Sequence, residues 1–322
     1  MKILHLETGQ YPVEALTAMA EVADIKSFDC VEQNELYTEL KKNSYEIIVT
    51  RLGIRIDRTC MDLQSRLLFI VSATTGLNHI DIEVARKKNI KIISLQGESE
   101  FLSSIKSTAE HTWALLMAMV RNLRSSSSEL LKGKWVRTPF ICDELNGKKL
   151  GIIGYGRLGQ IVAGYGVAFG MDVLVNDTQK IATIKSDRIF IVELDKLLAE
   201  SDYVMLMISW SKNNERFMNQ DRFDLMKHGS YFVNTSRGEL IDENALLQAL
   251  KSGKLKGAAL DVLQDDSSWD GDIQGSFPLI NYFTTQSNLI ITPHIGGYGK
   301  ESIARTRMFV TNKLIKELNK KS

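Results

Sequence analysis

Three segments in the second half of the chain could handle a proton and a negative charge at one carbonyl oxygen. Each begins as a short apolar run and ends in polar side chains, among them Arg237, Asp261 and His294. A guanidinium can stabilise an oxygen that gains negative charge, and an imidazolium can protonate that oxygen near neutral pH. If the apolar runs are strands of one parallel sheet, their carboxyl ends share the edge where such sheets bind ligands. The pattern therefore predicts that these three side chains converge.

A glycine-rich turn upstream of these segments predicts a dinucleotide phosphate site. Residues 151–159 read G-I-I-G-Y-G-R-L-G, an apolar strand that runs into G-x-G-x-x-G and then into a segment of helical period. Gly154 permits the tight turn, Gly156 lets a pyrophosphate approach the backbone, and Gly159 lets helix and strand pack closely. Glycine clusters also serve ordinary turns, but the strand before this motif and the helix after it favour dinucleotide binding. The predicted cofactor residues of the turn are Gly154, Gly156, Arg157, Leu158 and Gly159.

An acidic residue follows the next apolar run, where a ribose-binding carboxylate is expected. Asp177 lies 18 residues beyond Gly159, close to the roughly 20 residues typical of the acid that hydrogen-bonds the adenosine ribose hydroxyls. Its charge would repel the 2′-phosphate of NADP, and the nearest following cation is Lys180. The sequence therefore predicts NAD as the cofactor.

Short apolar runs alternate with longer segments of helical period along the chain, which is typical of parallel sheets with helical crossovers. In the first part the runs lie at residues 3–4, 47–49, 67–71 and 90–93. In the second part they lie at residues 150–153, 173–175, 203–208, 231–233, 257–260 and 289–291. The predicted fold class is α/β, with two doubly wound parallel-sheet domains.

Two longer helices are also expected. Residues 107–110, S-T-A-E, could form a capping box, so a long helix should begin there and run to about Arg121. Its apolar run at residues 113–117 could serve a two-fold dimer contact, and Trp135 is expected to be a packing residue. The segment from Ser302 carries apolar residues at helical spacing, which predicts an amphipathic helix that returns to the first domain.

Composition argues against several classes of partner. Of 322 residues, 44% are hydrophobic and 25% are charged, as in a soluble globular protein with a sizeable core. The 40 basic and 39 acidic residues leave a formal charge of +1, without the excess that nucleic acid or an anionic membrane ordinarily requires. The longest apolar run, residues 113–120, is far shorter than the roughly 20 residues of a membrane span. Cys30, Cys60 and Cys142 fit no zinc pattern and cannot all pair, so we expect no metal site and a cytoplasmic location.

The polar segments resemble the signatures of the D-isomer specific 2-hydroxyacid dehydrogenase family, which includes phosphoglycerate dehydrogenases. Residues 234–238 are similar to its Asn-x-x-Arg-Gly motif, residues 261–262 to its Asp-Val motif, and residues 292–297 to its Thr-Pro-His-x-Gly-Gly motif. The likeness covers nearly the whole chain, including Arg51 and the turn at residues 75–81. It implies an NAD-dependent oxidoreductase that moves a hydride between nicotinamide and C2 of a small D-2-hydroxy acid or 2-oxo acid.

The resemblance also implies a role for each matching residue. Arg237 would bind substrate and polarise its C2 carbonyl, His294 would exchange the proton of the C2 oxygen, and a family acid would hold and charge the histidine. The backbone of the turn would grip the substrate carboxylate, with Arg51 in the same pocket. The implied substrate residues are Arg51, Thr75, Gly76 and Leu77. The implied cofactor residues beyond the glycine turn are Asp177, Thr235, Ser236, Asp261, which would face the nicotinamide carboxamide, Ile295 and Gly297.

Two departures from the family pattern affect these assignments. Family members usually carry Glu-Pro shortly after Asp-Val, whereas this chain reads L-Q-D-D-S-S-W at residues 263–269. Counting from Arg237 places Asp266 at the family glutamate's position, and Asp265 is the alternative. Residues 208–211, I-S-W-S, replace a loop that commonly holds a proline, so a local change in the cofactor groove is expected.

Together these features predict a Rossmann NAD domain inserted into a flavodoxin-like substrate domain. The substrate domain would comprise residues 1–106 and 293–322, and the NAD domain residues 107–292, with the active site in the cleft between them. A homodimer is expected. One alternative is a formate- or phosphite-type dehydrogenase of the same fold, whose formate-oxidising members carry glutamine where Asp266 stands. The other alternative is a dinucleotide-sensing scaffold that resembles corepressors of this fold, against which the full set of arginine, acid and histidine argues.

Overall fold

The computed structural model describes residues 1–28, 32–181, 184, 186–269, 271–273 and 275–320. The chain divides into two compact units. Unit 1 comprises Met1–Ile105, Asp265–Gln274 and Tyr298–Ser322, and unit 2 comprises Lys106–Gln264 and Gly275–Gly297. Unit 2 is therefore inserted into unit 1, as the predicted fold class requires. The stretch from Asp265, which the proposed boundaries placed in the NAD domain, groups with unit 1 instead.

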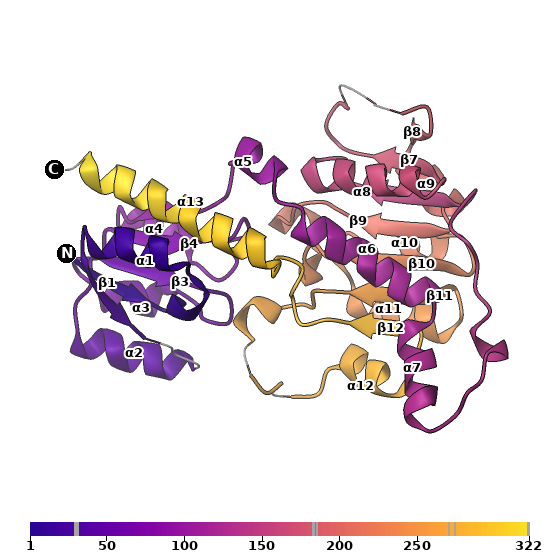
Figure 1. The fold of residues 1–322 in the computed structure, drawn as a ribbon, viewed down its shortest axis with the longest axis horizontal. Helices are drawn as coiled ribbons and strands as arrows, with labels where there is room; N and C mark the ends of the chain where they lie inside the picture. The colour runs from indigo at the N-terminus through magenta and orange to yellow at the C-terminus, as the bar shows by residue number, and fades with distance from the viewer. Residues whose placement is uncertain (29–31, 182–183, 185, 270, 274, 321–322) are drawn as a thin grey trace. The chain divides into compact units, whose positions relative to one another are not determined.

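Within the described residues, unit 1 is built on a five-stranded parallel sheet in the order β2-β1-β3-β4-β5. Its strands are β1 (Lys2–His5), β2 (Asp24–Ser27), β3 (Ile47–Thr50), β4 (Phe69–Ser72) and β5 (Lys91–Ile93). Its helices are α1 (Val13–Ala20), α2 (Gln33–Lys42), α3 (Arg58–Asp62), α4 (Ile82–Lys87), α5 (Ser99–Ser103) and α13 (Lys300–Asn319), with 3-10 turns η1 (Thr8–Gln10) and η5 (Asp266–Ser268). Figure 1 shows α13 lying beside α1.

Alternation along the strands of unit 1 produces two separate cores, one on each face of the sheet. Ile47 and Val49 of β3 pack with Val310 and Leu314 of α13, whereas Ile48 packs on the opposite face. Both faces are apolar because successive side chains of a strand point to opposite sides and helices cover both sides of this sheet. The returning C-terminal helix is therefore an integral part of the unit 1 core.

Unit 2 contains, in its described part, a seven-stranded parallel sheet in the order β12-β11-β10-β9-β6-β7-β8. Its strands are β6 (Lys149–Ile153), β7 (Asp172–Asn176), β8 (Ile189–Ile191), β9 (Tyr203–Leu206), β10 (Ser230–Asn234), β11 (Leu255–Leu260) and β12 (Leu289–Ile291). Its helices are α6 (Ser107–Val120), α7 (Leu123–Leu131), α8 (Arg157–Ala168), α9 (Leu194–Glu200), α10 (Gln220–Leu225), α11 (Glu243–Lys251) and α12 (Pro278–Thr285), with 3-10 turns η2 (Thr138–Phe140), η3 (Lys212–Asn214) and η4 (Gly238–Leu240). Helices α6 and α8 pack together on one face, and α9, α11 and α12 contact the other.

The order of strands in unit 2 places a topological switch point beside β6. From β6 the chain adds β7 and β8 on one side, then crosses back to add β9, β10, β11 and β12 on the other. The loops that leave β6 and β9 therefore diverge, and open parallel sheets bind ligands where their loops diverge in this way. The fold thus places the loops after β6, β10, β11 and β12 along one edge.

Several local predictions fail for physical reasons. Strands β2 and β8 were not predicted: both are edge strands, β2 has mostly polar residues, and β8 is a run of only three residues of which two are exposed. The long helix ends near Arg121 as predicted, but no side chain caps its start, and Ser107 donates to the Gly296 carbonyl at 2.7 Å instead. The capping box is therefore absent.

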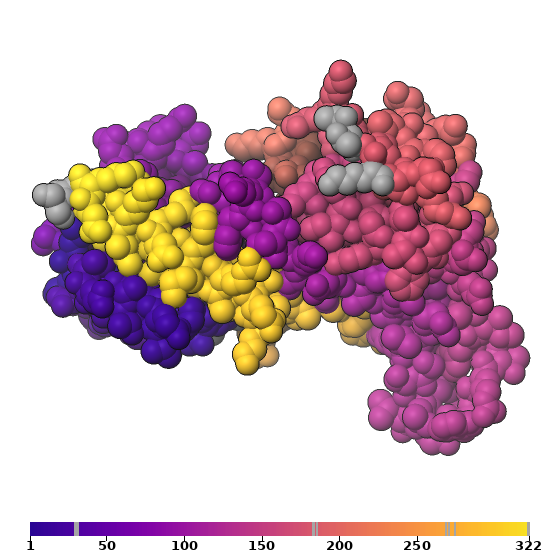
Figure 2. Space-filling view, turned by 45° about the horizontal axis from the view of Figure 1, so that its top comes forward, coloured from indigo at the N-terminus to yellow at the C-terminus, as the bar shows by residue number. Residues whose placement is uncertain are grey.

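Residues 113–117 do not present the apolar dimer face that was expected of them. Trp113, Leu115 and Leu116 are buried in the core between α6, α8 and the sheet. Trp135 is instead 74% exposed, contrary to its expected packing role. It lies in a segment that we call the arm, residues 123–141, which projects from the rest of unit 2 in Figure 2.

Across the described residues, no helix has the length and apolar character needed to cross a bilayer. Cys60 and Cys142 are free thiols, and Cys30 lies outside the described residues.

Candidate active site

The glycine turn after β6 has the geometry of a phosphate-binding turn. Gly154 has a φ of +96°, and a Cβ there would lie 2.7 Å from the Met207 carbonyl oxygen. A Cβ on Gly159 would lie 2.1 Å from the Gly154 carbonyl oxygen, so α8 packs against the turn as only glycine permits. Gly156, at the N-cap of α8, has nothing within 4 Å of its Cβ position. The turn therefore leaves open space beside the backbone at Gly156, at the positive end of α8, where helix N-termini favour phosphate groups.

Asp177 follows β7 and is joined to the same turn. Its carboxylate accepts hydrogen bonds from the Tyr155 N–H at 2.7 Å and from the Gln179 N–H at 2.8 Å. The Gly154 N–H donates to the Asn176 carbonyl at 2.8 Å, which ties the ends of β6 and β7 together. The predicted ribose acid and the predicted phosphate turn therefore form one structure.

Arg237 lies on a short loop after β10 whose shape is fixed by Asn234. The buried Asn234 amide donates to the Arg237 carbonyl at 2.8 Å and accepts from the Ser236 N–H at 2.9 Å. Ser236 donates its hydroxyl proton to the Leu206 carbonyl at 2.8 Å. A Cβ on Gly238 would lie 1.9 Å from the Leu263 carbonyl carbon, so the backbone beyond Arg237 abuts the chain that follows β11. Asn234 was part of the recognised motif, but its role in holding Arg237 was not predicted.

His294 lies on the loop after β12, and Asp261 organises that loop. The buried Asp261 carboxylate accepts from the Thr292 hydroxyl at 2.6 Å and from the Ile295 and Gly296 N–H groups at 2.9 and 2.7 Å. The His294 N–H donates to the Asp261 carbonyl at 2.8 Å. His294 adopts a φ of +55°, a left-handed conformation that such surrounding contacts must maintain.

His111 and Thr292 were not predicted as site residues, yet both contact Asp261. The His111 Nε2 lies 3.1 Å from Asp261 Oδ1 and 3.0 Å from the Thr292 hydroxyl oxygen. Burial opposes ionisation of Asp261, but these hydrogen bonds outweigh it and hold the pKa of Asp261 below its ordinary value. Asp261 is therefore ionised at neutral pH. The only signal for His111 in the sequence is weak: it follows Ala109-Glu110 on a helix of mostly apolar residues.

Unit 1 holds the residues predicted to bind substrate. Arg51 follows β3, and its guanidinium donates to the Leu52 carbonyl at 3.0 Å. The turn of Thr75, Gly76 and Leu77 follows β4, and the Thr74 hydroxyl donates to the Gly76 carbonyl at 2.7 Å. Both segments leave the carboxyl ends of neighbouring strands, which are the ligand-binding ends of a parallel sheet.

Asp266 also belongs to unit 1, where it begins η5. The Ser267 carbonyl accepts a hydrogen bond from the Gly53 N–H at 2.9 Å, which joins this turn to the loop that carries Arg51. Asp265 precedes it with a φ of +60°. Because Arg237 and His294 belong to unit 2, the pairing of either acid with His294 stays a prediction.

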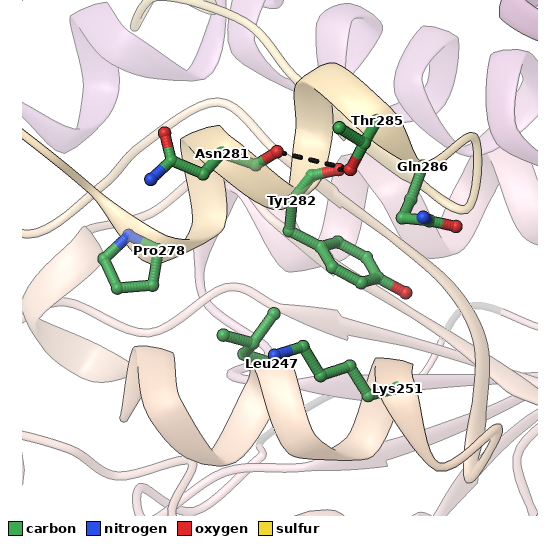
Figure 3. A pocket seen from close by; sticks show the side chains of 7 residues that line it. All are labelled: Leu247, Lys251, Pro278, Asn281, Tyr282, Thr285 and Gln286. Atoms are coloured by element: carbon green, nitrogen blue, oxygen red, sulfur yellow. Dashed lines mark hydrogen bonds between the residues drawn. The ribbon is translucent and has the colours of Figure 1, made fainter.

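A separate hollow of about 660 Å³ lies between α11 and α12 of unit 2. Figure 3 shows the Tyr282 ring extending from α12 toward Leu247 and Lys251 of α11. The lining residues are Leu247, Lys251, Pro278, Asn281, Tyr282, Thr285 and Gln286. None of these seven is a predicted site residue, so this hollow is distinct from the candidate active site.

Comparison with known proteins gives one consistent result. Residues 113–296 match the family model described as the NAD-binding domain of D-isomer specific 2-hydroxyacid dehydrogenases. The chain is 32% identical to the hydroxypyruvate reductase of Thermotoga maritima over 85% of each chain.

Solved structures with a similar fold carry bound nicotinamide cofactors. The D-lactate dehydrogenase of Aquifex aeolicus in complex with NAD and lactic acid has a TM-score of 0.81 and 30% identity, over 99% of this chain and 96% of that one. An acyclic imino acid reductase in complex with NADPH and D-Arg has a TM-score of 0.77 and 26% identity, over 100% and 98% of the two chains.

Proposed function

The chain belongs to the D-isomer specific 2-hydroxyacid dehydrogenase family, and on this premise we propose that it reduces a small 2-oxo acid to the D-2-hydroxy acid with NADH. Members of this family are oxidoreductases that act on a CH–OH group with NAD or NADP. The observation that carries the proposal is the placement of Arg237 and His294 on loops at the same sheet edge as the glycine turn. A dinucleotide held by that turn would meet both side chains at the ligand-binding edge of unit 2.

The chemistry assigned to each side chain follows from its charge and its proton. Bound nicotinamide supplies the hydride for reduction and takes it up for oxidation. The Arg237 guanidinium would bind the substrate and stabilise the negative charge that develops on its C2 oxygen, and His294 would give that oxygen its proton. In unit 1, Arg51 and the backbone of Thr75, Gly76 and Leu77 would bind the substrate carboxylate, and Asp266 would keep His294 charged. Asp261 would face the nicotinamide carboxamide.

The proposed preference for NADH rests on Asp177. Its ionised carboxylate would hydrogen-bond the ribose hydroxyls of NAD and repel the 2′-phosphate of NADP. Thr235, Ser236, Ile295 and Gly297 are proposed to line the same cofactor. The free thiols of Cys60 and Cys142 support a cytoplasmic location, where thiols stay reduced.

We also propose a homodimer that forms through the arm. The arm exposes several large apolar side chains, with Leu131, Trp135 and Ile141 at 90, 74 and 81% exposure. Large exposed apolar side chains on one projecting segment support an interaction site there. Arg124 fixes the base of the arm, because its guanidinium donates to the carbonyls of Phe283 and Gln286 at 2.6 and 2.8 Å. An arm fixed in this way can meet the arm of a second copy across a two-fold axis.

A panel of 2-oxo acids with NADH tests the reaction. The panel runs from glyoxylate through pyruvate and hydroxypyruvate to bulkier and phosphorylated acids, with NADH absorbance as the readout. A second series of assays adds ammonium, since one similar structure is that of an imino acid reductase. The reverse reaction with D and L enantiomers checks the stereochemistry. We expect oxidation of NADH with at least one acid and reverse oxidation of the D enantiomer only. Tight binding of NADH without turnover of any acid would instead favour the dinucleotide-sensing scaffold.

A further inference from the structure

The first half of helix α6 makes hydrogen bonds to both loops that carry the proposed catalytic residues. Ser107 and His111 lie one turn apart and bond to Gly296 and Thr292 of the His294 loop, and Thr112 bonds to the Arg237 loop. Residues four positions apart on a helix share a face, so Ser107 and His111 can both reach the same loop. A single rigid element therefore contacts both loops.

Besides these direct bonds, His111 contacts the His294 loop through Asp261. Since a carboxylate only accepts, His111 Nε2 must carry a proton and donate it to Asp261 Oδ1 at 3.1 Å. The Thr292 hydroxyl gives its single proton to the same oxygen at 2.6 Å, which leaves its lone pairs to accept from His111 at 3.0 Å. Asp261 in turn holds the N–H groups of Ile295 and Gly296, the two residues after His294. His111 thus steadies the carboxylate on which the loop is folded.

The contact with the Arg237 loop is a chain of two hydroxyl groups. The fully buried Thr112 donates its proton to the Thr108 carbonyl at 2.7 Å, as helical threonines often do. Its oxygen, 2.6 Å from the Thr235 hydroxyl oxygen, must then accept, so Thr235 is the donor. Thr235 lies between the last residue of β10 and Ser236, two positions before Arg237. The bond therefore fixes the start of that loop relative to α6.

We infer that Ser107, His111 and Thr112 are positioning residues that hold Arg237 and His294 at a fixed separation from each other. This inference rests on the proposed function, which assigns both residues to one carbonyl group. Hydride and proton reach that carbonyl productively only if the guanidinium and the imidazole keep a fixed separation, and misplacement by about 1 Å can cost 100-fold in rate. The two loops leave strands β10 and β12, with β11 between them, so they are not neighbours in the sheet. Helix α6 supplies a direct connection between them.

Paired substitutions separate positioning from general stability. His111→Leu removes the donor to Asp261, whereas His111→Gln keeps an N–H donor. Thr112→Val removes the hydroxyl at similar volume, whereas Thr112→Ser keeps it. Leu116→Ala is the matched control, because Leu116 is equally buried one turn further along α6 and its loss opens a cavity.

The readout is the single-turnover rate of hydride transfer per enzyme-bound NADH, measured by stopped flow with the fastest acid of the panel. NADH binding is titrated by fluorescence in every variant, and thermal unfolding is recorded. We expect His111→Leu and Thr112→Val to slow hydride transfer from bound NADH by about 10- to 100-fold, and the change in the NADH Kd to be clearly smaller than this loss of rate. His111→Gln and Thr112→Ser should recover most of the rate. Leu116→Ala should lower the unfolding temperature without slowing transfer.

Wild-type hydride transfer in both His111→Leu and Thr112→Val overturns the inference. Equal slowing in Leu116→Ala also overturns it, because the effect would then be loss of helix packing. Arg237→Lys and His294→Asn are measured in the same series. If these two variants also transfer hydride normally, the proposed site itself is wrong, which is a different failure from that of α6.

Discussion

The Asp177 carboxylate accepts a hydrogen bond from the Tyr155 N–H at 2.7 Å, inside the glycine turn. The acid proposed to select NAD therefore also supports the turn that would hold the pyrophosphate. A substitution that removes the whole carboxylate would disturb both functions, so the two must be separated in the choice of variant.

Asp177→Asn should relax the preference for NADH. The amide keeps an oxygen that can accept from the turn but loses the charge that repels a 2′-phosphate. We expect the ratio of kcat/KM for NADH to that for NADPH to fall by about tenfold or more, the size expected when a close like-charge contact is removed. Asp177→Ala should relax the ratio as well, but with weaker binding of both cofactors. Equal use of NADH and NADPH by the wild type would contradict the assignment of Asp177.

Arg237→Lys should lose most of the activity and keep cofactor binding. An ammonium group cannot reproduce the two-pronged geometry of a guanidinium on a carboxylate and a carbonyl. We expect kcat/KM to fall by about 100-fold or more, as when one donor to a developing oxyanion is lost, with the NADH Kd changed little. Steady-state kinetics and fluorescence titration measure the two quantities. Near-normal turnover would remove Arg237 from the site.

Asp266→Asn should shift the pH dependence of reduction. Reduction needs a protonated His294, and a neighbouring negative charge favours the protonated form, so the rate should fall as pH rises. If Asp266 contacts His294, loss of that charge should move the falling limb to lower pH and lower the activity at neutral pH. Asp265→Asn is the adjacent control. Movement of the limb in Asp265→Asn alone would make Asp265 the partner, and no movement in either variant would exclude both acids.

Substitution of the arm should shift the oligomeric state. Leu131→Ser combined with Trp135→Ser removes exposed apolar surface that the proposed two-fold contact would bury. We expect wild type to sediment at twice the chain mass and the double variant to shift toward the chain mass at micromolar concentration. Val13→Ser is the control, since Val13 is 73% exposed on unit 1, away from the arm in the sequence. A wild-type monomer, or a double variant that stays dimeric, would contradict the proposed contact.

Acid should weaken unit 1 through His5. Burial lowers the pKa of His5 to about 4, from 6.5 in the unfolded chain. Above pH 6.5 both states are neutral, whereas between pH 6.5 and 4 only the unfolded state binds the proton, so stability falls as pH falls. The loss by pH 4 should reach about 3 kcal/mol. In urea unfolding, His5→Gln should lose less stability over this range than wild type, and substitution of the exposed His228 should change nothing. Parallel pH profiles for wild type and His5→Gln would refute the assignment.

Much of the fold, and the placement of the candidate residues on loops at one sheet edge, could be predicted because both depend on residue types at short spacing. Gly154 needs a positive φ and Gly159 has no room for a Cβ, so the glycine turn could be recognised. The apolar runs before Arg237 and His294 were correctly predicted to be strands. Such local patterns specify the sheet, its parallel strands and the loops that carry polar side chains. Strand β2 was missed because an exposed edge strand need not be apolar, and β8 was missed because its apolar run is only three residues long.

Contacts between residues far apart in the chain were decided only by the tertiary structure. Ser107 could cap its own helix by sequence, but its hydroxyl donates to Gly296, 189 positions away. His111 has an unremarkable helical position, and only the folding of β11 and β12 against α6 brings Asp261 and Thr292 to its ring. Trp135 is large and apolar, yet the arm leaves it exposed. A hydrogen-bond donor or an apolar surface has no preferred partner within the chain until packing supplies one, and local sequence therefore cannot identify that partner.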